Sequence, residues 1–107
     1  MEATTGKYPF VLRCPHTDMK ILFWYDDGKI YCKRSMDNLE TFFAYNDPTL
    51  GNTNEDITPL ECVNDADDSA FSAIITLDNT ATVVLCYFCG GVIKNVYSPD
   101  GSPPYTV

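Results

Sequence analysis

The sequence contains one histidine, His16, and no motif that is typical of a catalytic site. It has no glycine-rich phosphate-binding loop and no Gly-x-Ser-x-Gly motif. A single imidazole leaves little capacity for acid–base catalysis. A nucleophilic pair of Cys14 and His16 is disfavoured, because the rigid Pro15 separates the two residues. We therefore expect a protein that is not an enzyme.

Long apolar runs are also absent. No stretch approaches the ~18 residues of a membrane-spanning helix, and residues 1–10 lack the basic start and apolar centre of a signal peptide. The five cysteines are an odd number, which argues against a complete disulfide framework. We expect reduced thiols, no membrane association and an intracellular location, in the cytoplasm or the nucleus.

The composition is that of a folded chain. Its 107 residues are 45% hydrophobic, which excludes intrinsic disorder and suffices for one core but not for two. We expect a single compact domain over 1–107, with the Pro- and Gly-rich residues 98–107 as a flexible C-terminal tail.

A β-hairpin is the clearest structural feature of the sequence. Asp27-Gly28 separates two β-rich runs, and Asp-Gly is a strong signal for a two-residue turn. This turn places Asp26 opposite Lys29, Tyr25 opposite Ile30, Trp24 opposite Tyr31 and Phe23 opposite Cys32. One face of the predicted hairpin is apolar and should pack on the core; its members are Ile21, Phe23, Tyr25, Ile30 and Cys32.

Further strands are predicted at 8–14, 70–77, 80–88 and 92–97, the second and third forming another hairpin. Residues 36–45 have the apolar spacing of one short helix. Residues 46–68 form a long acidic loop with a short strand near Leu60. The predicted fold is mainly β, with α+β as the alternative: about six short antiparallel strands and one helix.

Charge is distributed unevenly along the chain, whose net charge is -8. Between Ser35 and Cys89 there is no basic residue, whereas the same stretch contains ten acidic ones. Such a block either steers a basic partner by its long-range field or only solubilises the surface. The candidate partner-binding carboxylates are Glu55, Asp56, Asp65, Asp67 and Asp68.

The cysteines predict a metal site. Cys86 and Cys89, followed by two glycines, have the Cys-x-x-Cys-Gly spacing of a zinc knuckle, and Cys14 with His16 resembles an irregular zinc-ribbon knuckle. These four residues could hold one structural zinc, with Cys32 and Cys62 as substitutes for His16. The alternative is that the thiols pack as small hydrophobic groups, because Cys86 and Cys89 point to opposite faces of an extended strand.

Two functional hypotheses follow. The first is a small, acidic, non-enzymatic module that binds a protein with a basic surface, as an inhibitor or nucleic-acid mimic of viral or phage accessory type would. The alternative is a single-stranded nucleic-acid-binding domain, which would use the second face of the hairpin. That face combines stacking aromatics with lysines, namely Trp24, Tyr31, Lys20, Lys29 and Lys33. The net charge disfavours nucleic acid.

Overall fold

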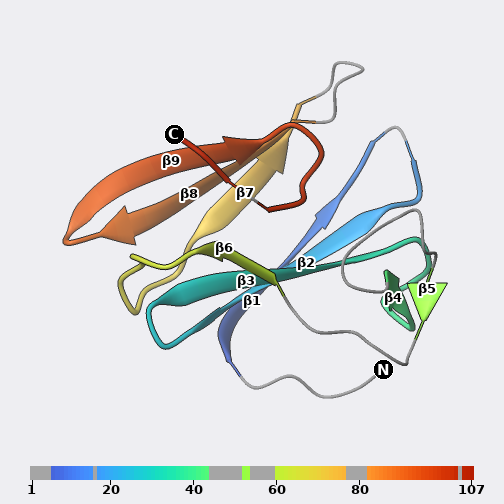
Figure 1. Cartoon of the computed structure of the whole chain (residues 1–107), viewed down its shortest axis with the longest axis horizontal. Coiled ribbons are helices and arrows are strands. Elements are labelled where there is room, and N and C mark those ends of the chain that lie inside the picture. The colour runs from blue at the N-terminus through green and yellow to red at the C-terminus, as the bar shows by residue number, and fades with distance from the viewer. Residues whose placement is uncertain (1–5, 16, 44–51, 54–59, 77–81, 104) are drawn as a thin grey trace.

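The computed structural model describes residues 6–15, 17–43, 52–53, 60–76, 82–103 and 105–107. These residues form a compact, mainly β fold in which paired strands are antiparallel, so the predicted fold class is confirmed. A four-stranded sheet has the order β1 (Lys7–Arg13), β2 (Lys20–Asp26), β3 (Lys29–Ser35) and β6 (Leu60–Val63). A three-stranded sheet has the order β7 (Ser72–Ile75), β8 (Val83–Cys89) and β9 (Val92–Ser98). A separate pair, β4 (Phe42–Phe43) and β5 (Asn52–Thr53), lies at the far end of the four-stranded sheet (Figure 1).

The hairpin of β2 and β3 has the register that the Asp-Gly signal predicts. Trp24 lies opposite Tyr31 and Asp26 opposite Lys29. Asp27 and Gly28 both have positive φ, 49° and 80°, which is the conformation of a type I′ turn. The second predicted hairpin, β7 with β8, and the strand near Leu60 are also present.

The core lies between the two sheets. The predicted apolar face of the first hairpin is buried, and Ile21, Phe23 and Ile30 are fully so. They pack in one cluster with Ala73, Leu85 and Val96 of the other sheet; the same cluster also contains Val83 and Tyr87. The alternating burial of β8 arises because every second side chain of a strand faces the same side of its sheet.

The predicted helix at 36–45 is wrong over the part that the structure describes. Residues 36–41 are bends, and Phe42 and Phe43 form β4. The Asp37 carboxylate accepts hydrogen bonds from the backbone N–H groups of Glu40 and Thr41, at 3.0 and 3.1 Å, and from the Thr41 hydroxyl at 2.6 Å. These bonds resemble those of a helix N-cap, but Leu39 adopts a positive φ of 65°, which a right-handed helix does not contain, so no helix continues.

The C-terminal residues also differ from the prediction of a flexible tail. Tyr105 is buried in the core, where its ring centroid lies 6.3 Å from that of Phe23, and its hydroxyl donates to the Gly101 carbonyl at 2.8 Å. Thr106 then pairs with Tyr97 of β9. Burial of one large aromatic ring therefore returns the chain to the domain, and the end of the chain lies beside the three-stranded sheet (Figure 1).

Candidate protein-binding surfaces

The aromatic pair proposed to stack bases is present but covered. The rings of Trp24 and Tyr31 are stacked, with centroids 5.8 Å apart. Trp24 is only 5% exposed, and the Lys33 ammonium lies 5.7 Å from its ring and 5.2 Å from that of Phe42. Since Trp24 and Lys33 are both buried, the part of this face that the structure describes has no open platform for bases.

The remaining two lysines of that face are engaged locally. Lys29 forms an ion pair with Glu61 at 3.7 Å, and the Lys20 ammonium donates to the Asp18 carbonyl at 3.1 Å. The geometry therefore does not favour the nucleic-acid interpretation.

Three of the predicted partner-binding carboxylates lie together, on the segment that links β6 to β7. Asp65 accepts a hydrogen bond from the Tyr87 hydroxyl at 2.6 Å and forms an ion pair with Lys94 at 2.7 Å. The Lys94 hydrogen bond, followed by that of Tyr87, lowers the pKa of Asp65. Burial, together with the hydrogen bond to Asp65, raises the pKa of Tyr87 to about 12.

Asp67 and its neighbours connect the two sheets. The Asp67 carboxylate accepts hydrogen bonds from the N–H groups of Gly90 and Gly91, at 2.9 and 2.8 Å, in the turn between β8 and β9. The adjacent Ala66 N–H donates to the Gly28 carbonyl in the turn between β2 and β3, at 3.0 Å. This segment therefore holds both hairpin turns at once, and its conformation is fixed by internal bonds.

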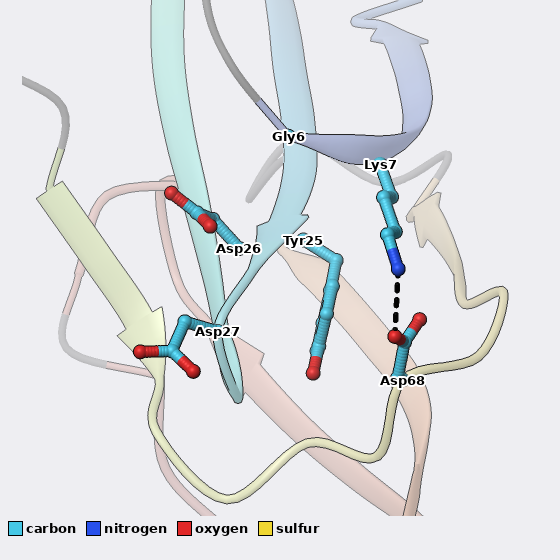
Figure 2. A pocket seen from close by; sticks show the side chains of 6 residues that line it. All are labelled: Gly6, Lys7, Tyr25, Asp26, Asp27 and Asp68. Carbon is cyan, nitrogen blue, oxygen red and sulfur yellow. Dashed lines mark hydrogen bonds and ion pairs between the residues drawn. The ribbon is translucent and has the colours of Figure 1, made fainter.

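Asp68 closes a pocket of about 400 Å³ near the first hairpin turn. Its carboxylate binds the Lys7 ammonium and the Tyr8 hydroxyl, both at 2.8 Å, and these bonds lower its pKa. Figure 2 shows the Lys7–Asp68 pair on one side of the Tyr25 ring and Asp27 on the other. Asp26 and Asp27 are exposed at this pocket, so it has an excess of negative charge.

Asp65, Asp67 and Asp68 thus stabilise the fold, which the sequence did not indicate. Spacing along the chain cannot reveal the lysines and glycines that bind them, because those partners lie up to 61 positions away. Glu55 and Asp56, the other predicted binding carboxylates, lie outside the described residues.

The cysteines of the predicted knuckle lie on a regular strand. Register places Cys86 opposite Asn95, on the outer face of the three-stranded sheet, whereas Cys89 is on the inner side with its sulfur 3.5 Å from Asp65. The following glycines form a tight turn with φ of 59° and 81°. The two thiols therefore do not converge as a knuckle requires.

Cys14 is buried at the end of β1. In the described part of the chain, no three His, Cys, Asp or Glu side chains gather as metal ligands would. His16 lies outside that part. Zinc binding through the full set of four residues stays a prediction.

The two substitute ligands are close together inside the fold. Burial, and then the neighbouring Cys32, raises the pKa of the Cys62 thiol, so both sulfurs behave as core groups.

An exposed apolar surface, which is not among the predicted sites, covers the outer face of β7, β8 and β9. Ile74, Phe88, Ile93 and Tyr97 are 63%, 41%, 65% and 47% exposed. Register places all four on this face, together with Val84 and Cys86, and its remaining members, Ser72 and Asn95, are uncharged. We call this surface the outer apolar face. A hollow of about 270 Å³ opens on it, lined in part by Phe71, Phe88 and Ile93.

One signal in the sequence was available for this surface. The run at 83–88, VVLCYF, is apolar at every position rather than at alternate ones. Such a run indicates a strand with apolar residues on both faces. The run does not show which of the two faces is exposed to solvent.

Comparison with protein-family models, with curated proteins and with solved structures finds no match. Among the described residues no helix is long and apolar enough to cross a membrane.

Proposed function

We propose that this protein is a small, acidic, non-enzymatic module that binds another protein through the outer apolar face. The observation that carries the proposal is the exposure of four large hydrophobic side chains on one uncharged sheet face. Soluble monomers rarely leave a contiguous apolar patch of more than a few hundred Å² without a binding role. The hollow beside Phe88 would take an anchoring side chain, which is where binding energy concentrates in interfaces.

The negative charge of the protein favours one class of partner. The net charge of -8 and the exposed carboxylates of Asp26 and Asp27 favour a partner with a basic surface, because complementary potentials raise the rate of encounter. Apolar contact and electrostatic steering thus have separate locations on the molecule. An intracellular inhibitor or nucleic-acid mimic is the kind of protein that would combine them.

Capture experiments with two matched variants test this function. Ile93→Lys places a charge on the outer apolar face, whereas Val11→Lys places the same charge on β1, at a residue of similar exposure, 50%. We expect immobilised wild-type protein and Val11→Lys to retain the same basic proteins from an extract, and Ile93→Lys to lose most of them. Equal retention by all three proteins would contradict the proposal.

A further inference from the structure

The edge of the three-stranded sheet presents unpaired backbone groups. The sheet order makes β9 an edge strand. In an antiparallel pair, alternate residues direct both N–H and C=O toward the neighbouring strand, and the others direct them away. Tyr97 directs both groups away from β8, because its N–H and C=O are bonded to Thr106 at 2.8 and 2.9 Å. By the same alternation, Asn95 and Ile93 also direct theirs away from β8.

The C-terminal residues of the chain already pair with part of this edge. Thr106 pairs antiparallel with Tyr97, so residues 105–107 start a further strand on β9. Beyond Tyr97 the backbone groups of Asn95 and Ile93 have no partner among the described residues. Strand edges are usually protected by proline or by charged side chains. β9 has no proline and one charge, Lys94, whose ammonium is held by Asp65 at 2.7 Å.

A groove lies under this free edge. It has a volume of about 350 Å³ and separates β9 from β6, the edge strand of the other sheet. Glu61 and Asp65 line it and are paired with Lys29, at 3.7 Å, and Lys94, at 2.7 Å, and residues 105–107 complete the lining. Both groove carboxylates are thus paired, and it is the net charge of -8 that favours basic side chains on this inner side, whereas Ile93 and Tyr97 give the outer side its apolar character.

We propose that the free part of β9 accepts an extended segment of a partner protein as an added antiparallel strand, in which apolar residues alternate with basic ones. This inference rests on the proposed protein-binding function and specifies its partner. Side chains of an added strand point alternately to its two faces. Those on the outer side extend the outer apolar face, and those on the inner side meet Glu61 and Asp65.

A proline substitution isolates the backbone contribution. Asn95→Pro removes an N–H that points away from β8, so the pairing of β8 with β9 is retained, as proline is accepted on edge strands in that orientation. Asn95→Ala is the matched control, because it removes the same side chain and keeps the N–H. The probe is a blocked synthetic peptide of four Val-Lys repeats, and a peptide of four Val-Glu repeats tests the charge requirement.

Calorimetry should show that wild-type protein and Asn95→Ala bind the Val-Lys peptide equally. Binding should weaken at least tenfold in Asn95→Pro, and the Val-Glu peptide should not bind. A second measurement does not depend on the variant folding: in wild-type protein, the peptide should slow hydrogen exchange at the amides of Ile93 and Asn95. Equal binding by the two variants, or protection elsewhere, would overturn the inference. So would a wild-type dimer that Asn95→Pro converts to a monomer, since a second copy would then occupy the edge.

The outer-face variant separates the two proposals. Ile74→Lys changes β7, which forms the opposite edge of the sheet from β9. Loss of partner capture in Ile74→Lys with unchanged capture and peptide binding in Asn95→Pro would retain the function and reject strand addition. Unchanged capture in Ile74→Lys and Ile93→Lys would reject the proposed function, even if the peptide still protected the β9 amides.

Discussion

The outer faces of the two sheets differ in what covers them. On the four-stranded sheet, Trp24 and Tyr31 stack and Lys33 lies between Trp24 and Phe42, so an aromatic surface is buried. On the three-stranded sheet, Phe88 and Ile93 remain open to solvent. The residue types on these two faces would suit a buried face and a binding face equally well. Aromatic composition alone therefore does not identify a binding surface. The deciding property is whether other side chains of the protein bury the aromatic residues.

Truncating one aromatic residue on each sheet should separate stability from binding. Trp24→Ala should lower the free energy of unfolding by about 3–5 kcal/mol, since it empties a buried site. Phe88→Ala should cost less than about 1 kcal/mol, because the side chain is 41% exposed, yet it should reduce partner capture. Urea unfolding measures the first quantity. A large stability loss in Phe88→Ala would mean that the face supports the fold and is not reserved for a partner.

A second comparison concerns two glycines with the same backbone conformation, Gly91 and Gly101, both at φ of 81°. A Cβ on Gly101 would lie 2.6 Å from Ile21 Cδ1 and 3.3 Å from Val83 Cγ2, where the two sheets meet, whereas on Gly91 it meets nothing within 4 Å. Gly101→Ala should therefore be less stable than Gly91→Ala by roughly 1–3 kcal/mol, the usual cost of overpacking. Equal thermal unfolding temperatures of the two variants would show that the sheets can move apart at Gly101 without loss of stability.

The accuracy of sequence reasoning depended on how local each signal was. Asp27-Gly28 determines the register of β2 and β3, because a two-residue turn fixes every pair behind it. The helix prediction failed because Leu39 adopts a positive φ of 65°, a backbone conformation that apolar spacing does not reveal. Tyr105 was assigned to a tail because its burial depends on Phe23, which is 82 positions earlier in the chain.

The candidate site was harder to predict than the fold. The acidic residues at 65, 67 and 68 are recognisable as a charged cluster, but their internal partners come from two distant parts of the chain, Lys7 from β1 and Gly90 and Lys94 from the hairpin of β8 and β9. The outer apolar face depends on the order of strands in a sheet, which local patterns leave open. Strand existence is a local property, and exposure of a face is a tertiary one.

The smallest expected effect concerns acid stability and the segment that joins the sheets. Folding lowers the pKa of Asp65 from its ordinary value of 3.8, chiefly through Lys94. Below that pH the unfolded chain binds protons more readily than the folded one, so the stabilisation is complete above about pH 3.8 and is lost as the pH falls. Asp65→Asn should be less stable than wild type at pH 7, and the difference should shrink toward pH 2. A difference for Asp65→Asn that stays constant with pH would mean that the Lys94 pair contributes nothing, and Lys94 would then be free to protect the edge of β9 against an added strand.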